Sequence, residues 1–246
     1  MGIEDFQPFR FGVAGDWHGN TLYAVDALDY FADRFVDHVV HLGDFGYQFT
    51  PEFVKLLTRT LEENDQHLWF IDGNHENQIT LHTFPMAADG TKSVSKRIHF
   101  LPRGFRWEWN GVRMLGLGGA FSIDKRHRTP GVSWWPEEEI NWDEAERVIA
   151  GGQADIMFTH DCPSGVEIPD LRRNPMNLPV HVLNQANNHR NLLRQIVDEV
   201  KPGKLYHGHY HVKYDSQLWG PDYTTDVHGL DCDGTPLKLN TLIVDL

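Results

Sequence analysis

Histidines and acidic residues follow five short predicted strands of this chain, at the point where each strand ends. Imidazole, carboxylate and amide groups bind divalent cations such as Mn, Fe, Co, Ni and Zn, and no cysteine stands among these residues. Glycine precedes or flanks most of them and lets the backbone approach an ion closely. We therefore expect a metal site formed by Asp16 and His18, Asp44, Asn74, His160, and His209 and His211.

Each of these residues has an ordinary interpretation when it is taken alone. Asp16 and Asp44 fit simple turns, Asn74 fits a capping position, and His160 fits a hydrogen-bonded core residue. Their order along the chain is what favours a common site, because loops after neighbouring strands converge at one edge of an open α/β sheet.

The elements that must position these residues alternate in the first third of the chain. Buried strands are predicted at 9–14, 39–42 and 67–71, and helices at 22–31 and 53–61, with Asn20 or Thr21 as the first N-cap. This alternation is typical of an α/β sheet with crossover helices.

The rest of the chain reads as further strands with two more helices. Asn110-Gly111 indicates a hairpin, and Pro136 with the acidic residues after it indicates the start of a helix. The predicted strands are 98–101, 105–109, 112–117, 156–159, 205–207, 213–218, a stretch around 227, and 237–244, and the other helix is 191–200.

Composition narrows the functional classes. The 246 residues are 40% hydrophobic with a net charge of −13, which is typical of a folded protein without a basic surface for nucleic acid or anionic membranes. Two cysteines are too few for a disulfide framework. No secretory signal and no apolar run of membrane-spanning length is apparent. We expect one cytoplasmic domain over residues 1–246, with no linker dividing it.

The motifs resemble those of the calcineurin-like metallophosphoesterases. The family pattern of Asp-x-His, Gly-Asp, Gly-Asn-His-Glu, a lone His and Gly-His-x-His matches segments from Asp16 to His211, which is most of the chain. The resemblance implies a four-layer α-β-β-α sandwich of two mixed sheets flanked by helices. It also implies ligand roles: one ion on Asp16, His18 and His211, the other on Asn74, His160 and His209, and Asp44 bridging both.

Such a site implies metal-dependent phosphoester hydrolysis. Two divalent ions about 3.5–4 Å apart repel each other, and a shared carboxylate with a bridging hydroxide holds them together and supplies the nucleophile. Manganese is the ion we favour, with Fe, Zn, Co or Ni as alternatives. By the same resemblance, His75 binds no metal and is the catalytic candidate, protonating the leaving oxygen or holding the phosphate. Glu76 either orients His75, supports the ligands, or is an ordinary solvated acid.

A basic run stands out in this acidic chain, at residues 124–131. It reads either as a solvated loop anchored by Trp134 and Trp135, or as a lid whose Arg126 or Arg128 contacts the substrate. The loop-rich stretch 163–179 is a candidate for another wall of the cleft.

The expected substrate class depends on two arginines that this sequence lacks. Protein serine/threonine phosphatases of the same superfamily carry arginines beside both central motifs, whereas here Phe45 follows Asp44 and Asp72 precedes Gly73. We therefore expect a phosphodiesterase acting on a small phosphoester, with nucleotides as candidates and no nucleic-acid polymer or membrane as partner. The alternatives are a phosphomonoesterase resembling those phosphatases and a non-catalytic metal-binding interaction module.

Overall fold

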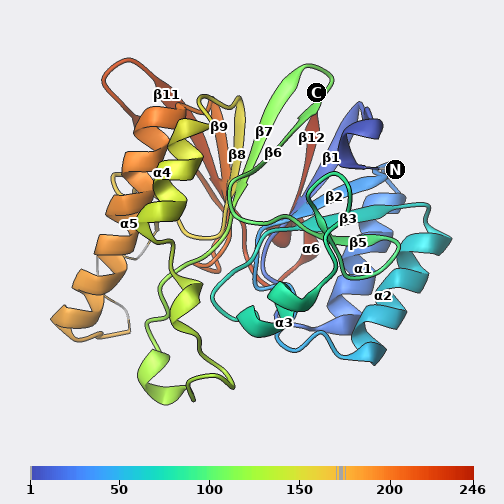
Figure 1. The fold of residues 1–246 in the computed structure, drawn as a ribbon, viewed down its shortest axis with the longest axis horizontal. Helices are drawn as coiled ribbons and strands as arrows, with labels where there is room; N and C mark the ends of the chain where they lie inside the picture. The colour runs from blue at the N-terminus through green and yellow to red at the C-terminus, as the bar shows by residue number, and fades with distance from the viewer. Residues whose placement is uncertain (1, 170, 172–173, 175) are drawn as a thin grey trace.

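Two β-sheets stacked face to face form the centre of the protein, and helices cover the outer face of each (Figure 1). The computed structural model describes residues 2–169, 171, 174 and 176–246. Helices α4 and α5 lie on the left of the sheets in Figure 1, and α1 and α2 lie on the right. The predicted four-layer α-β-β-α sandwich is confirmed.

The first sheet has a parallel centre and antiparallel edges. Its strand order is β12-β1-β2-β3-β5-β4, in which β1, β2, β3 and β5 run parallel while β12 and β4 run antiparallel to their neighbours. The strands are β1 (Arg10–Ala14), β2 (His38–His41), β3 (His67–Phe70), β4 (Lys92–Ser93), β5 (Ile98–Phe100) and β12 (Thr241–Asp245). Parallel strands place their carboxyl ends along one edge, and the predicted ligands follow those ends.

The second sheet is mixed in the same way. Its order is β10-β11-β9-β8-β7-β6, with parallel pairing from β11 through β7 and antiparallel pairs at both edges. The strands are β6 (Phe105–Trp109), β7 (Val112–Leu117), β8 (Ile156–Thr159), β9 (Lys204–His207), β10 (Tyr214–Trp219) and β11 (Thr224–Gly229). The hairpin predicted at Asn110-Gly111 joins β6 to β7.

The helices are short, except for α5. Side-chain caps begin most of them, as Asn20 does by accepting from the Tyr23 amide, so Asn20 is the predicted N-cap. The α-helices are α1 (Thr21–Ala32), α2 (Pro51–Glu63), α3 (Gln78–Thr83), α4 (Trp142–Ala150), α5 (Val180–Val200) and α6 (Leu237–Asn240), with 3-10 helices at Ile3–Asp5, Lys125–His127 and Pro136–Glu138. None of the helices in the described part of the chain could span a membrane.

Three apolar clusters hold the layers together. One lies between the sheets and contains Phe11, Trp69 and Phe158. The second packs the first sheet against α1 and α2, and the third packs the second sheet against α4 and α5. Because both sheets bury their inner faces in one cluster, the loops at their ends are held in fixed relative positions.

Three details of the sequence prediction are wrong. Pro136 begins only one 3-10 turn, and the α-helix starts at Trp142 after the capping residue Asn141. Helix α5 begins at Val180 rather than at 191. Residues 237–240 form a helical turn before β12, and that turn directs the buried Asn240 side chain to the Trp17 indole. These segments depend on distant contacts that local periodicity does not record.

A stack of histidines, of which His38 is buried and His67 and His99 are half-buried, lies near the amino ends of the first sheet's strands, away from the predicted ligands. The His38 and His67 rings are 5.7 Å apart, those of His67 and His99 are 5.8 Å apart, and the His99 ring lies 4.3 Å from that of Trp69. Burial lowers the pKa of each histidine to about 4. The charged groups around them are Arg97, Asp65, Asp89 and Asp37.

This stack predicts acid-sensitive folding. The native state keeps the three imidazoles neutral, whereas the unfolded chain protonates them below its pKa of about 6.5. The contribution of these three histidines to the free energy of unfolding is therefore fully present above that pH, and it is lost as the pH falls from about 6.5 towards 4. Denaturant unfolding across this range, with chelator present, measures the slope. His99→Phe keeps a ring against Trp69 and removes one titration, so it should flatten the slope; an unchanged slope contradicts this origin.

Candidate metal and active site

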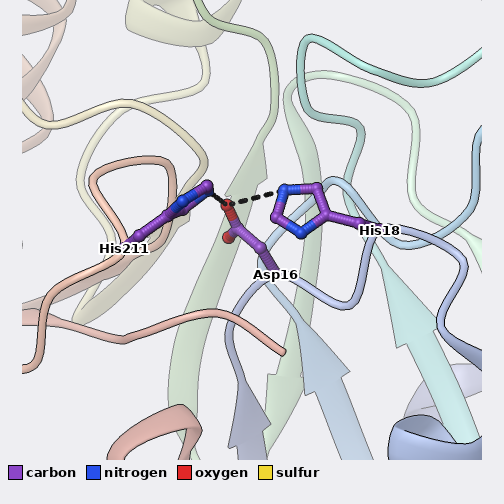
Figure 2. A group of neighbouring side chains, drawn as sticks. All are labelled: Asp16, His18 and His211. Carbon is purple, nitrogen blue, oxygen red and sulfur yellow. Dashed lines mark ion pairs between the residues drawn. The ribbon is translucent and has the colours of Figure 1, made fainter. Parts of the chain in front are cut away.

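Asp16 and His18 come from the loop after β1, and His211 meets them from the loop after β9 (Figure 2). Asp16 is fully buried at the end of β1, and His18 follows in the turn before α1. The Asp16 Oδ2 atom lies 3.2 Å from Nε2 of His211 and 3.9 Å from Nε2 of His18. One carboxylate oxygen facing two imidazole nitrogens is an arrangement that could hold a divalent ion.

Asp44 lies at the centre of the remaining groups. Its Oδ2 atom is 3.4 Å from Nε2 of His160, 3.6 Å from Nε2 of His18 and 3.8 Å from Nε2 of His75. Asp16, Asp44 and His160 form one potential ligand group, and His18, Asp44 and His75 form another. Asp44 therefore belongs to two of the three groups found in the described residues, as Asp16 and His18 also do. The role of Asp44 as the bridging ligand stays a prediction.

His160 provides a test of whether these residues fit a cation. Its Nδ1 atom lies 2.8 Å from the Leu42 carbonyl oxygen, to which only a protonated nitrogen can donate. Without a second proton, the ring would turn the lone pair of Nε2 towards the Asn74 Oδ1 atom at 3.0 Å and towards Asp44. Three acceptors that face one another require a positive charge between them. The residues therefore fit a bound cation.

The charge of His160 agrees with this interpretation. Burial lowers the pKa of this ring, but Asp44 and Asp16 outweigh burial and raise the pKa to about 10. A proton thus takes up the surrounding negative charge in the metal-free protein, and ligand binding to a metal would displace it.

The backbone around the site is strained. His18, Asp44, His209 and His211 have φ values of 48°, 52°, 68° and 51°, in the left-handed region that side-chain-bearing residues rarely adopt. Such strain persists where the surrounding structure enforces it, and it gathers at functional sites.

Two glycines permit the close approach of the loops. A Cβ atom at Gly43, where φ is 95°, would lie 2.7 Å from Nδ1 of His160, and one at Gly208 would lie 2.1 Å from Oδ1 of Asp16. No other residue fits at either position. The expected role of glycine beside the ligands is therefore present at these two sites.

His209 lies beside the ligand groups. Its backbone amide donates to Asp16, and its ring centroid lies 5.0 Å from that of His160. Its side chain is outside the three ligand groups that the described residues form. The assignment of His209 to the second ion stays a prediction.

Glu76 supports the loops that carry two of the predicted ligands, Asp44 and Asn74. The carboxylate is almost fully buried and accepts from the backbone amides of Gly73 at 2.6 Å, Asp44 at 3.1 Å and Gly46 at 3.1 Å. Of the three roles considered from the sequence, this geometry favours support of the ligands, since a solvated acid would be exposed. The carboxylate joins the loop after β2 to the loop after β3.

Sequence reasoning missed Asp233, which orients His18. The Asp233 Oδ1 atom lies 2.7 Å from Nδ1 of His18, and Asn20 donates to the other oxygen at 2.8 Å. The Nε2 atom of His18 is thereby turned towards Asp16 and Asp44. A carboxylate behind a ligating histidine is common in metal sites, but Asp233 stands in a turn near the carboxyl terminus where spacing gives no signal.

The basic run brings one of its two candidate arginines into the site. Arg128 donates from Nη2 to Nε2 of His75 at 2.6 Å and from Nη1 to the Asn74 carbonyl at 3.0 Å, while Asp124 pairs with its guanidinium at 2.8 Å. Arg126 is exposed and does not line the cavity, because the 3-10 turn Lys125–His127 directs it to solvent. Of the two arginines, Arg128 is the one that lines the cavity.

His75 is neutral in this arrangement. Burial lowers its pKa, and the Arg128 guanidinium lowers it further. Because Nε2 accepts the Arg128 hydrogen bond, that nitrogen holds a lone pair rather than a proton.

A cavity of about 1120 Å³ opens from the ligand groups. Its lining includes Asp44, Asn74, His75, His209 and His211 together with Arg128. Apolar side chains, among them Val166, Ile168, Leu183 and Val212, and the guanidinium of Arg190 also line it. The stretch 163–179 thus forms a wall in its described part, while residues 170, 172, 173 and 175 lie outside the described residues.

The comparison with solved structures agrees on the fold. A dimetal phosphatase from Danio rerio superposes with a TM-score of 0.58 at 14% identity, covering 98% of this chain and 93% of that one. The protein TT1561 of Thermus thermophilus gives 0.53 at 13% identity, covering 96% of this chain and 98% of that one. At these identities the likeness is one of fold. No curated protein matches the sequence.

The family comparison covers the ligand motifs themselves. The model of the calcineurin-like phosphoesterases matches residues 9–232, which includes every predicted metal ligand from Asp16 to His211. The family acts through a centre of two divalent metal ions, and this chain brings potential ligand groups together at the corresponding strand ends. The chain belongs to the calcineurin-like phosphoesterase family.

Proposed function

We propose that this chain is a phosphodiesterase that hydrolyses small phosphodiesters, with nucleotides as candidate substrates. The observation that carries the proposal is one cavity whose described lining joins potential metal ligands, the Arg128 guanidinium at His75 and a set of apolar side chains.

The residues that would hold two ions are those described above. Asp16, His18 and His211 face one position, Asn74 and His160 face the other with His209 beside them, and Asp44 faces both. Such ions, with Mn²⁺ as our first choice, supply Lewis-acid activation of water and of the phosphoryl oxygens when bound.

Charge favours a diester. A phosphomonoester carries close to two negative charges near neutral pH, and tight binding of it calls for cationic donors beyond the metals. Two guanidinium groups belong to the described lining. Arg128 contacts His75, and its charge is partly offset by Asp124. Arg190 instead donates to backbone carbonyls, those of Cys162, Pro163 and Val166. A diester carries one negative charge and is matched by one such donor.

The shape of the cavity supports the same choice. Its volume of about 1120 Å³ exceeds what one phosphate group fills, and it is comparable with sites for whole small ligands. A diester has two ester arms, and the apolar wall gives the second arm a place to bind out of water.

Phosphomonoesterase activity is the second candidate, and Arg128 is the observation that favours it. A structurally similar protein is described as a dimetal phosphatase. An arginine that contacts His75 is placed to bind a phosphate, so the basic run could supply charge that the central motifs lack.

The cytoplasmic location and the absence of a nucleic-acid partner stay predictions.

One experiment separates these functions. With Mn²⁺ supplied, we expect kcat/KM for an aryl phosphodiester to exceed that for the matching aryl monoester. Arg128→Ala should lower both values, and the monoester value more, because the dianion depends more on the guanidinium. Arg126→Ala is the matched control, since it removes an exposed arginine of the same loop.

The outcome can go against the proposal in two ways. A parent preference for the monoester that disappears in Arg128→Ala would promote the phosphatase function. Turnover of neither ester by a protein that binds its metals would instead support a non-catalytic metal-binding module.

A further inference from the structure

Hydrogen bonds link three buried side chains in a row, those of Asn74, Ser122 and Glu138. The Asn74 Nδ2 atom donates to Ser122 Oγ at 3.0 Å, and Ser122 Oγ donates to Glu138 Oε2 at 2.8 Å. The Ser122 backbone amide donates to the other carboxylate oxygen at 2.9 Å. Asn74, Ser122 and Glu138 are 4%, 1% and 1% exposed, so water does not compete for these bonds.

The Glu138 carboxylate decides which group donates and which accepts in each of these hydrogen bonds. A carboxylate has no proton to donate, so Glu138 accepts both the amide hydrogen and the single hydroxyl hydrogen of Ser122. Ser122 Oγ is then left with lone pairs for Asn74, and only the Nδ2 end of the Asn74 amide can donate to them. The Oδ1 end must point the other way, where it lies 3.0 Å from Nε2 of His160.

We propose that Glu138 is a positioning residue for metal binding, which acts through Ser122 to hold the Asn74 amide with its oxygen towards the ion. The inference rests on the proposed function, because it takes Asn74 to be a ligand. An amide turned by half a rotation would present N–H groups to a cation and could not bind it.

The backbone of Glu138 is held independently of these hydrogen bonds. Its carbonyl oxygen accepts from Nη2 of Arg103 at 2.9 Å and from the Ala120 amide at 3.0 Å. Arg103 is in turn paired with Asp72 at 2.7 Å. The loop therefore stays anchored when the Glu138 side chain changes, which separates the effect on Asn74 from an effect on folding.

Glu138→Gln tests the direction of these hydrogen bonds with almost no change in shape. Glutamine offers one acceptor oxygen, which the Ser122 amide takes, and its NH₂ group then donates to Ser122 Oγ. The hydroxyl hydrogen must turn to Asn74, which rotates its oxygen to Ser122 and its NH₂ to the ion. Burial raises the pKa of Glu138 to about 7, so the measurements belong at pH 8, where the parent carboxylate is ionised.

We expect Glu138→Gln to weaken one of two Mn²⁺ ions by about 10- to 100-fold, the usual effect of losing a group that orients a ligand. Titration calorimetry and elemental analysis after dialysis measure this without reference to turnover. The Tm of the chelated protein should stay close to that of the parent. Glu137→Gln, which changes the exposed neighbouring side chain, is the matched control and should bind both ions normally.

The double variant Glu138→Gln/Ser122→Ala distinguishes orientation from packing. Without the hydroxyl nothing forces the Asn74 amide to turn, so the double variant should bind the weakened ion more tightly than Glu138→Gln and about as well as Ser122→Ala. A role in packing alone predicts that the second substitution makes binding worse. That result, or normal binding by Glu138→Gln, overturns the proposal.

Asn74→Ala separates this inference from the proposed function. If Asn74→Ala keeps both ions, Asn74 is no ligand and the assignment beneath the inference fails. If Asn74→Ala loses one ion while Glu138→Gln keeps both, only the role of Glu138 fails. Hydrolysis of the aryl diester by the parent decides the proposed function separately.

Discussion

Asp44→Asn is expected to bind fewer than two metal ions per chain and to lose all measurable turnover. One oxygen of Asp44 faces His160 at 3.4 Å and His18 at 3.6 Å, so its charge serves both metal positions. Asparagine has nearly the same shape but no charge to hold two mutually repelling cations. Its Oδ1 atom can still accept from the His75 amide, as Asp44 does at 2.9 Å, which keeps the loop in place.

Elemental analysis of the purified variant measures this effect directly. His18→Ala is the comparison, because His18 faces Asp16 and Asp44 from one side of the site and should mainly affect one ion. Two ions per chain retained by Asp44→Asn would show that the bridging assignment is wrong, even if turnover fell.

His75→Ala is expected to keep its metal content and to lose on the order of 10²–10⁴ in rate, the usual contribution of acid–base catalysis. If His75 protonates the leaving oxygen, the loss should shrink for nitrophenolate, which needs little protonation, and grow for alkyl leaving groups. His127→Ala removes an exposed histidine of the neighbouring loop and is the control.

The hydrogen bond between Arg128 and His75 explains what it would mean if the rate loss were the same for all leaving groups. In the substrate-free protein Nε2 of His75 accepts from Arg128, so His75 must gain a proton before it can act as an acid. A phosphate that draws the guanidinium towards itself would free that nitrogen. An equal loss for good and poor leaving groups would count against proton donation and leave His75 with the role of holding Arg128 and the phosphate.

Local sequence patterns predicted the elements that carry the ligands. Strand ends at residues 14, 41 and 70 fall within one residue of the predicted ends, because buried strands in a parallel sheet are short apolar runs that stop at Gly-Asp or Gly-Asn. The Asn20 cap was also among the predictions, because its hydrogen bond to the Tyr23 amide spans only three residues and is therefore encoded locally. The sandwich itself came from the resemblance of the motifs, and the family comparison agrees with that resemblance.

Tertiary contacts decided the parts that local patterns misjudged. Residues 237–240 are apolar enough for a strand, but Asn240 is needed as a partner for Trp17, and a helical turn places it there. Arg126 and Arg128 are chemically alike in the sequence, and only the 3-10 turn that separates them sends one to His75 and the other to solvent.

The sequence by itself determined the candidate ligand residues and the strands that end beside them, because both are encoded within a few neighbouring positions. Only the tertiary structure decided which groups orient those ligands. Asp233 reaches His18 across 215 positions and Ser122 reaches Asn74 across 48, and a hydrogen bond between distant loops leaves no period or spacing in the chain. Its partners become visible once the stacked sheets hold the loops at one edge.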